Sequence, residues 1–465
     1  MLEKDLQKKA EGIFKDIGVL TTSFDYRIKG AKVVDLIGFT ADDKGNLEPT
    51  VIAELEKKFS PLAINSAYKL AEDVGVNYFC IVTPKVVSWY EIKDEEIIPL
   101  KEPPTLKSES KANFKTEKLL SLIEFLRNRG LTEEDIAEVV ADLLLIHFYL
   151  QKHRHILEGA SFKQLLSWAQ DEFSQLPGWV DDRHYEHIDL DYLYSTVKSW
   201  SIFNITGYTV VEIFDKILGG KRHANLSMPH SLRKLVGEFL KAMNTINNPT
   251  IIDPACGHAG LLNEVACNYP KPTAWGMEIN PKISRFAGIV SIASNKAINI
   301  INEDSLGEDL PSHYIEGFDV VSTVPAFGVQ LNKKIKPLLQ ETTTSDGDIL
   351  WLSLAVELAK PGGVISVTVP EGVLFQAQKQ SLRNKILEHC CLEGIISLPN
   401  GTFYPAASVK SSILFLRRKG PDISQPFEVF VGEIENLRRG KFDDEEIKEM
   451  IDTFSTYQKE VAIKQ

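Results

Sequence analysis

The feature that most constrains the fold is a strand, a tight turn and a helix that follow one another at residues 251–262. This stretch reads IIDPACGHAGLL, so an apolar run leads into Asp-Pro, then into small residues, then into a helical pattern. Small residues let a ligand approach the backbone, and the free N–H groups of a helix N-terminus attract anionic ligand groups. The pattern predicts a ligand-binding loop, although an ordinary strand-to-helix turn has a similar composition.

Strands and helices alternate from residue 230 to about 418, which favours a mostly parallel sheet with helices on both faces. We therefore predict a Rossmann-like α/β domain with a seven-stranded sheet. The seven apolar strand candidates lie at 250–252, 273–278, 297–301, 318–323, 363–369, 394–398 and 411–416.

Acidic residues stand at the ends of three successive predicted strands, at Asp253, Glu278 and Asp304. In an open parallel sheet, ligands bind beyond the carboxyl ends of the strands. Glu278 can accept hydrogen bonds from both ribose hydroxyls of a nucleoside, and Asp304 can accept one from an adenine amino group. Each acid alone is more often a solvated loop charge or a helix cap than a ligand-binding residue. Together, after a glycine-rich turn, they predict a nucleoside cofactor site.

Length, net charge and composition limit the number of domains and the partners that the chain is expected to have. A chain of 465 residues is expected to hold about three domains. Its net charge of −12 argues against binding DNA by bulk charge, because phosphate binding depends on Lys and Arg, but a local basic face or a DNA-binding partner stays compatible. The sequence lacks an apolar stretch of the ~18 residues that span a membrane, a secretory signal and any metal-type cysteine spacing. We expect a cytoplasmic protein without a membrane partner.

The domain organisation follows from changes in pattern along the chain. Residues 1–100 predict a small α/β domain, and the proline- and lysine-rich segment 100–113 predicts a linker. Residues 114–222 predict a helical domain, in which Thr132 caps a helix with an acidic first turn. The α/β domain described above occupies 223–420, and 421–465 is expected to be a charged tail with a short helix at 443–455.

The Asp-Pro-Ala-Cys-Gly core of the turn resembles the cofactor loop of DNA adenine-N6 methyltransferases, in particular the modification subunits of type I restriction-modification systems. Further segments match that family: 348–351 (DILW), 360–363 (KPGG), 369–375 (VPEGVLF) and 397–404 (SLPNGTFY). The resemblance implies a class I S-adenosylmethionine-dependent methyltransferase fold. It also implies that S-adenosylmethionine binds at Pro229, Asp253, Pro254, Ala255, Cys256, Gly257, Gly260, Glu278, Asp304 and Ser305.

The family's catalytic motif, Asn-Pro-Pro followed by Phe or Tyr, is altered in this chain to Val324-Pro325-Ala326-Phe327. In the family, the Asn side-chain oxygen and the Pro carbonyl hold the adenine amino group for attack on the methyl group. Valine cannot accept a hydrogen bond, while Pro325 keeps its carbonyl and Phe327 can stack on a flipped base. The neighbouring hydroxyls of Ser322 and Thr323 are displaced from the Asn position.

The cofactor turn also departs from the family, because His258 and Ala259 replace the usual Ser and Gly. Ala259 costs little unless that position needs a positive φ angle. The acids and the glycines at 257 and 260 are retained. The sequence therefore supports cofactor binding better than methyl transfer.

The N-terminal domain resembles the nuclease-like domains linked to restriction proteins, which carry Asp … Glu-x-Lys. Here the pattern is Asp35 … Glu54-Leu55-Glu56, so Glu56 stands at the lysine position. Asp35, Glu54 and Glu56 are weak metal-site candidates, because the cation that polarises the attack is missing. We expect a nuclease-like fold without cleavage activity.

Two functional hypotheses follow. The first is a DNA adenine-N6 methyltransferase-type subunit that reaches DNA through a separate specificity subunit, as a hetero-oligomer or a homodimer. The second is a catalytically inactive, cofactor- or DNA-binding component of such a complex. The altered motif at Val324 favours the second hypothesis, and the retention of the other motifs favours the first.

Overall fold

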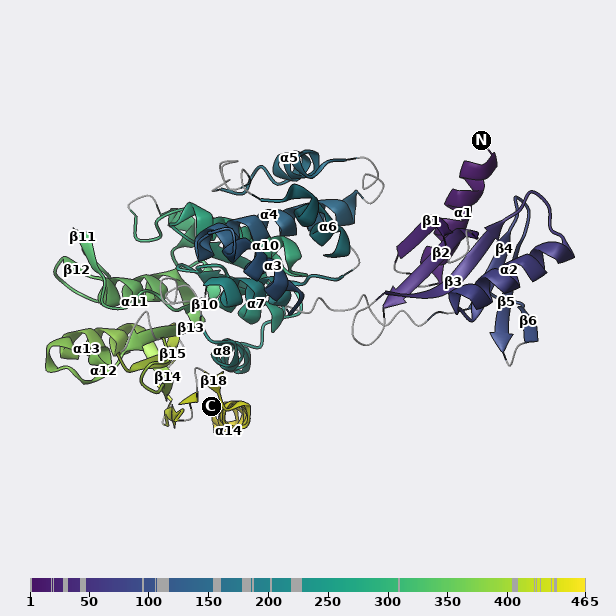
Figure 1. Ribbon diagram of the computed structural model, residues 1–465. Helices are drawn as coiled ribbons and strands as arrows, with labels where there is room; N and C mark the ends of the chain where they lie inside the picture. The colour runs from purple at the N-terminus through teal and green to yellow at the C-terminus, as the bar shows by residue number, and fades with distance from the viewer. Residues whose placement is uncertain are drawn as a thin grey trace. The chain divides into compact units, whose positions relative to one another are not determined.

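Figure 1 shows the computed structural model of the chain, which forms two compact units. One unit comprises Met1–Lys118 with Lys198–Ile205, and the other comprises Leu119–Val197 with Thr206–Gln465. Among the described residues, no helix is long and apolar enough to cross a membrane. The structure describes residues 2–464 except 18, 20, 28–31, 42–46, 94–95, 105, 107–116, 154–159, 178–184, 186–187, 201–202, 219–227, 308–309, 404–408, 422, 424, 427, 436 and 439–440.

The N-terminal unit is a six-stranded sheet in the order β1-β2-β3-β4-β5-β6, in which β3 and β4 are parallel and the other pairs antiparallel. Successive residues of β3 point to opposite faces: Val51 and Ala53 pack in the core with α1, and Ile52 packs with α2. The elements are α1 (Leu2–Asp16), β1 (Thr21–Arg27), β2 (Val33–Ala41), β3 (Leu47–Leu55), α2 (Pro61–Val74), β4 (Tyr78–Val82), β5 (Val87–Lys93) and β6 (Glu96–Leu100).

Three features of this unit differ from the sequence prediction. Strand β1 is polar and was not expected, and β6 contains Pro99, which an edge strand tolerates because its outer N–H groups need no partner. Leu106, in the expected linker 100–113, is 6% exposed and its N–H donates to the Ile17 carbonyl at 3.1 Å. This part of the segment therefore belongs to the N-terminal core, and most of the remainder lies outside the described residues.

The helical segment contains the expected helices and an additional one, α3. Thr132 caps α4 as predicted: its hydroxyl accepts from the Asp135 N–H at 3.2 Å, and Asp135 accepts from the Thr132 N–H at 3.0 Å. The expected stop at residues 219–220 lies outside the described residues. The helices are α3 (Glu117–Arg127), α4 (Glu133–Lys152), α5 (Phe162–Glu172), α6 (Leu190–Trp200) and α7 (Gly207–Leu218).

An acidic stripe on α4 attaches this segment to α10 (Pro281–Ala293) of the following domain. Glu134, Glu138 and Asp142 are four residues apart and so share one face of α4. Lys282 Nζ lies 2.8 Å from Glu134 and 2.7 Å from Glu138, and Arg285 pairs with Asp142. Arg285 and Asp142 are almost fully buried, so removal of either partner would leave an uncompensated charge.

The large sheet has eight strands in the order β16-β14-β15-β13-β10-β7-β8-β9. All its pairs are parallel except those of β15 with β13 and β14, which confirms the mostly parallel prediction. The seven expected strands are present, and β16 adds an eighth from the tail. They are β7 (Thr250–Asp253), β8 (Thr273–Met277), β9 (Ala297–Ile301), β10 (Phe318–Thr323), β13 (Ala359–Pro370), β14 (Cys390–Ser397), β15 (Ser411–Arg418) and β16 (Phe430–Glu433).

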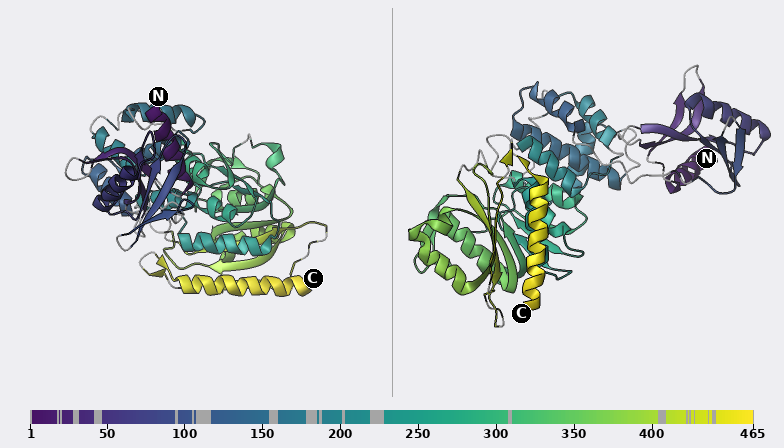
Figure 2. Two further views of the ribbon diagram at one scale, coloured as in Figure 1. Left: turned by 90° about the vertical axis from the view of Figure 1, so that its right-hand side faces the viewer. Right: turned by 90° about the horizontal axis from the view of Figure 1, so that it is seen from below.

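Helices cover both faces of this sheet, as Figure 2 shows, with α11 and α13 on one face and α14 on the other. The tail helix α14 is longer than the expected 443–455 and packs along α8, with Phe454 stacked on Phe239 at 3.8 Å between ring centroids. The remaining elements are α8 (His230–Met243), α9 (Gly260–Cys267), β11 (Gln330–Ile335), β12 (Thr344–Asp346), α11 (Gly347–Leu358), α12 (Gly372–Phe375), α13 (Gln380–His389), β17 (Leu437–Arg438), β18 (Lys441–Phe442) and α14 (Asp444–Lys464).

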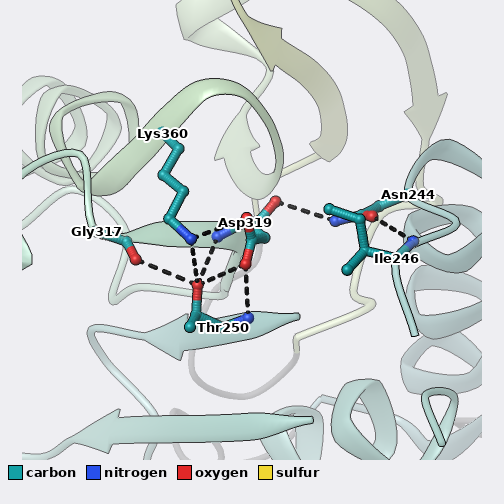
Figure 3. A network of polar contacts seen from close by, with 6 residues as sticks. All are labelled: Asn244, Ile246, Thr250, Gly317, Asp319 and Lys360. Atoms are coloured by element: carbon teal, nitrogen blue, oxygen red, sulfur yellow. Dashed lines mark hydrogen bonds and ion pairs between the residues drawn. The ribbon is translucent and has the colours of Figure 1, made fainter. Parts of the chain in front are cut away.

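A polar network joins the amino ends of β7, β10 and β13 (Figure 3). The Thr250 N–H donates to Asp319 Oδ2 at 2.8 Å, and Lys360 Nζ donates to Asp319 Oδ1 at 3.0 Å and to Thr250 Oγ1 at 3.1 Å. Burial alone would raise the pKa of Asp319, but these donors outweigh it and hold the pKa below its usual value. The network fixes three central strands at the edge opposite their carboxyl ends.

Candidate functional site

The three acids predicted from strand ends lie at the carboxyl edge of three neighbouring strands. Strand β7 pairs with β8 through Asp253 and Gly276, and the Glu278 N–H donates to the Ile301 carbonyl at the end of β9 at 3.0 Å. The strand-end rule therefore places Asp253, Glu278 and Asp304 in adjacent loops, as the sequence predicts.

Asp253 is the buried acid of this group, with 2% of its surface exposed. Its Oδ1 accepts from the Ala255 N–H at 3.0 Å, and the Thr323 hydroxyl approaches the carboxylate without full hydrogen-bond geometry. Burial raises the pKa of Asp253 to about 7, and the nearby Glu278 carboxylate adds to the rise. A cation placed beside Asp253 would favour its ionised form.

The turn after β7 needs left-handed backbone at two positions. Gly257 has φ +55°, which glycine adopts without cost, and Ala259 has φ +64°, which costs an L-residue about 1–2 kcal/mol. The alanine at 259 is therefore a strained replacement for glycine. The turn is also packed closely onto β8, because a Cβ at Gly276 would lie 2.8 Å from the Cys256 sulfur.

Glu278 and the loop after β9 complete the cofactor edge. Glu278 Oε1 accepts a hydrogen bond from the Asn280 N–H at 2.8 Å. Burial raises the pKa of Glu278, and backbone N–H groups, including those of Asn280 and Gly257, partly offset this rise. Asp304 is exposed and accepts from the Leu306 N–H at 3.0 Å. Ser305 is buried and donates to the Pro254 carbonyl at 2.6 Å, so it ties this loop to the turn after β7.

His258, the other departure in the turn, has a partner that the sequence motifs did not indicate. Its Nε2 lies 2.9 Å from Oδ1 of Asp215 on α7, and Arg233 Nη2 on α8 lies 2.8 Å from the second oxygen, Oδ2. Burial alone would raise the pKa of Asp215, but His258 and Arg233 lower it well below the usual range. Pro229, predicted as a cofactor residue, precedes α8 and accepts from the Arg233 N–H at 3.0 Å.

The altered catalytic motif forms the loop after β10, next to β7 in the sheet. Pro325 is buried, Val324 and Phe327 are half-buried, and Ala326 is exposed. Asp348 Oδ1 accepts from the Gly328 N–H at 3.0 Å, and the Phe327 ring meets the Phe403 ring edge-on at 5.3 Å between centroids. The last residue of the 397–404 segment, Tyr404, lies outside the described residues.

The hydroxyls nearest this motif, on Ser322 and Thr323, are buried. Ser322 and Thr323 are 0% and 1% exposed, and Thr323 faces Asp253 rather than the loop. Among the described residues, the loop offers the Pro325 carbonyl but no side-chain acceptor at position 324.

The N-terminal candidates lie together without forming a recognised metal centre. Asp35 Oδ2 accepts from the Leu55 N–H at 2.7 Å, and burial raises the pKa of Glu54 to about 7, with the Asp35 and Glu56 carboxylates adding to the rise. Within the part of the chain that the structure describes, no group of three or more His, Cys, Asp or Glu side chains is arranged to hold a metal ion.

The cofactor edge fits an adenosyl ligand with a positive charge. At Ala255, Gly257 and Gly260 the turn has no side chain that extends beyond Cβ, so a ligand can approach its backbone. Glu278 supplies a carboxylate that can accept hydrogen bonds from ribose hydroxyls. The buried Asp253 supplies a second carboxylate whose ionisation a cationic ligand would stabilise. These acceptors suit the ribose hydroxyls and the amino group of S-adenosylmethionine.

A sheet of this order, with a glycine-containing turn after β7 and acids after β8 and β9, has the class I S-adenosylmethionine-dependent methyltransferase fold. The chain belongs to the N-6 DNA methylase family, whose profile matches residues 218–464, more than half of its length. Membership of this family implies S-adenosylmethionine as the cofactor.

Curated relatives and solved structures agree with this family. The chain is 28% identical over 233 residues to the type I restriction enzyme EcoEI methylase subunit of Escherichia coli, covering 45% of this chain and 46% of that protein. It is 34% identical over 215 residues to the EcoKI methylase subunit of E. coli K12, covering 40% of this chain and 39% of that protein. The chain thus spans less than half the length of these relatives.

The solved structures show the fold. The type I restriction-modification methyltransferase subunit from Streptococcus thermophilus has a TM-score of 0.53 and 16% identity, covering 73% of this chain and 92% of that one. A chain from a solved type I restriction-modification assembly has a TM-score of 0.53 and 19% identity, covering 72% and 81%.

Proposed function

We propose that this chain is the S-adenosylmethionine-binding, methyltransferase-type subunit of a DNA modification or defence complex, and that its transfer of methyl groups to adenine N6 is very slow or absent. The observation that carries this proposal is the contrast at neighbouring strand ends. The turn after β7 keeps the buried Asp253 carboxylate, which accepts a hydrogen bond from the Ala255 backbone N–H. The loop after β10 has Val324 at the position where a hydrogen-bond acceptor is needed.

The residues of the cofactor edge have separate roles in this proposal. Glu278 would bind the ribose hydroxyls, Asp304 the adenine edge, and Asp253 the positively charged part of the cofactor. When bound, S-adenosylmethionine supplies a methyl group activated by the adjacent sulfonium. The Ser305–Pro254 hydrogen bond keeps two of these loops together.

The transfer step depends on how the adenine amino group is held. Its lone pair is delocalised into the ring, so an active site must orient the amino group by accepting its hydrogens. The Pro325 carbonyl can accept one hydrogen, and Val324 leaves the other without a partner, which is costly in a dry site. Removal of one such partner slows other enzymes by about 10²–10³-fold.

DNA recognition is proposed to come from a separate specificity subunit, within a hetero-oligomer. The net charge of −12 supports this, because phosphate binding needs clustered cations. A second candidate function is a non-catalytic component of the same complex, which the Val324 replacement favours over an active enzyme.

A methyl-transfer assay with labelled S-adenosylmethionine and unmethylated genomic DNA tests the proposal, run with the unmodified chain alone and in its native complex. We expect no transfer, or transfer at the limit of detection, in both cases. Robust adenine methylation by the unmodified chain would show that another group replaces the amide, and the chain would then be an active methyltransferase.

A further inference from the structure

Asp215 lies outside every motif that the sequence suggested, yet both of its carboxylate oxygens are used at the cofactor turn. Oδ1 lies 2.9 Å from His258 Nε2, and Oδ2 lies 2.8 Å from Arg233 Nη2. The His258 and Arg233 side chains are 1% and 4% exposed, whereas Asp215 is 24% exposed. One carboxylate on α7 thus joins the turn after β7 to α8.

Arg233 contacts the other side of the same turn. A Cβ at Gly260 would lie 2.8 Å from Arg233 Nη1, so the guanidinium packs directly against the first residue of α9. His258 and Gly260 flank Ala259, the residue with the left-handed backbone. Asp215 therefore holds the turn on both sides of its strained residue.

This arrangement bears on the cofactor residues through the backbone. The left-handed conformation of Ala259 is unfavourable for an L-residue, so it persists only where the surroundings fix it. The same turn includes Gly257, whose N–H is directed at the Glu278 carboxylate. If the turn relaxed, that N–H would move away from Glu278 and the backbone would no longer fit a ligand closely.

We propose that Asp215 is a positioning residue of the cofactor loop: it holds His258 and Arg233 so that residues 257–260 stay in the conformation that binds S-adenosylmethionine. Asp215 itself does not touch the cofactor. The inference rests on the proposed function in one respect, namely that the ligand of this loop is S-adenosylmethionine.

The test compares Asp215→Asn with Glu212→Gln. Glu212 lies on the same helix and pairs with Lys216 at 3.1 Å on the surface, so it is a matched charge removal away from the turn. The S-adenosylmethionine dissociation constant is measured by calorimetry, and amide hydrogen exchange of residues 255–260 is measured without ligand. We expect Asp215→Asn to weaken binding about tenfold or more, which is ~1.4 kcal/mol, and to lose protection at 255–260 but not in β13 or β15. Glu212→Gln should change neither.

Two replacements of His258 provide a readout that a general loss of stability would not reproduce. In His258→Gln the side-chain amide can still donate to Asp215, so binding should stay within about threefold of the unmodified chain. His258→Leu keeps the bulk but removes the donor, and should weaken binding as Asp215→Asn does. This pair also decides the question if Asp215→Asn fails to fold.

The outcomes are distinguishable. If the unmodified chain does not bind S-adenosylmethionine, the proposed function fails. If it binds, and Asp215→Asn and His258→Leu bind equally well, the positioning role is wrong. Loss of exchange protection throughout the sheet domain, with an unchanged dissociation constant for the folded fraction, would also contradict it and leave Asp215 a structural residue.

Discussion

The turn after β7 and the loop after β10 lie at neighbouring strand ends, and both depart from the residues usual in their family. In the turn, His258 has acquired the Asp215 carboxylate as a partner, and the strained Ala259 lies between two residues that Asp215 and Arg233 hold. In the loop, Val324 and Ala326 have apolar side chains, and among the described residues no other side chain takes the place of the acceptor at position 324. On the account proposed above, the side chains around the turn compensate for its departures, and the loop has no such compensation.

This difference separates cofactor binding from methyl transfer, two properties that usually occur in the same protein. Cofactor binding depends on backbone shape and on acids that this chain keeps. Methyl transfer depends on one further acceptor at a single position. A chain can therefore lose the reaction while it keeps the site, provided that the changes are confined to the loop after β10.

The largest change in the rate of methyl transfer is expected from Val324→Asn combined with Ala326→Pro, which would remove the difference between the turn and the loop. This double replacement restores a side-chain acceptor beside the Pro325 carbonyl. Because one such partner is worth about 10²–10³-fold in rate in other enzymes, we expect methyl transfer to rise at least a hundredfold. Single-turnover incorporation of labelled methyl groups into adenine, in the native complex, measures it.

Val324→Leu serves as the control for this replacement, because it changes volume without adding an acceptor and should give no gain. If the double replacement also gives no gain although it binds the cofactor normally, the loop is inactive for another reason. The position of Phe327 against Phe403 would then be the next feature to alter.

A smaller effect, on the affinity for S-adenosylmethionine, should distinguish Asp253 from Asp304. Asp253→Ala removes a buried carboxylate and should weaken S-adenosylmethionine binding by about 10- to 100-fold, as hydrogen bonds to charged groups are worth ~1.5–3 kcal/mol. Asp304→Ala removes an exposed acid that already accepts from Leu306, and should cost less than about tenfold. Calorimetric titration of both variants checks the order, and the reverse order would refute these roles.

Binding should also depend on pH because of Asp253. Its pKa of about 7 in the free protein means that the carboxyl is largely protonated at pH 5.5, whereas a cationic ligand favours the ionised form. Affinity should therefore rise about tenfold between pH 5.5 and 7.0, with release of a proton on binding. Asp253→Asn should remove that rise. A variant that keeps the rise would assign the titration to a group other than Asp253.

The smallest effect at the site is expected from Asp319→Asn, at the opposite edge of the sheet. The change weakens the network with Thr250 and Lys360 and should lower the free energy of unfolding by ~1–3 kcal/mol. The S-adenosylmethionine dissociation constant of the folded protein should change less than about twofold. A larger change in affinity would show that the two edges of the sheet are coupled.

Sequence reasoning located the residues that local rules determine. Asp253, Glu278 and Asp304 follow from the rule for strand ends, and the seven strands follow from apolar runs bounded by turn residues. Strand β1 was missed because its sequence, TTSFDYR, has few apolar residues to form an alternating pattern. Strand β6 was missed because it contains Pro99, and proline argues against a strand except at the edge of a sheet.

Contacts between distant segments could not be predicted in this way. Asp215 is separated from His258 by 43 residues, and Asp142 from Arg285 by 143, so nothing in the local pattern of either helix identifies the partner. The positive φ of Ala259 could be raised only as a condition, because the family usually has glycine there but alanine itself does not indicate left-handed backbone. The four-residue spacing of Glu134, Glu138 and Asp142 places them on one helix face but does not identify Lys282 or Arg285 as their partners.

The account is tested most directly by calorimetric titration of S-adenosylmethionine into the unmodified chain. If the turn at 253–260 is held in a binding conformation, as proposed, S-adenosylmethionine binds saturably at one site per chain, whether or not the chain transfers methyl groups. A folded protein that gives no binding heat at millimolar ligand over a range of temperatures would contradict it. The changes at His258 and Ala259 would then have disabled the turn, as we propose that Val324 disables the loop.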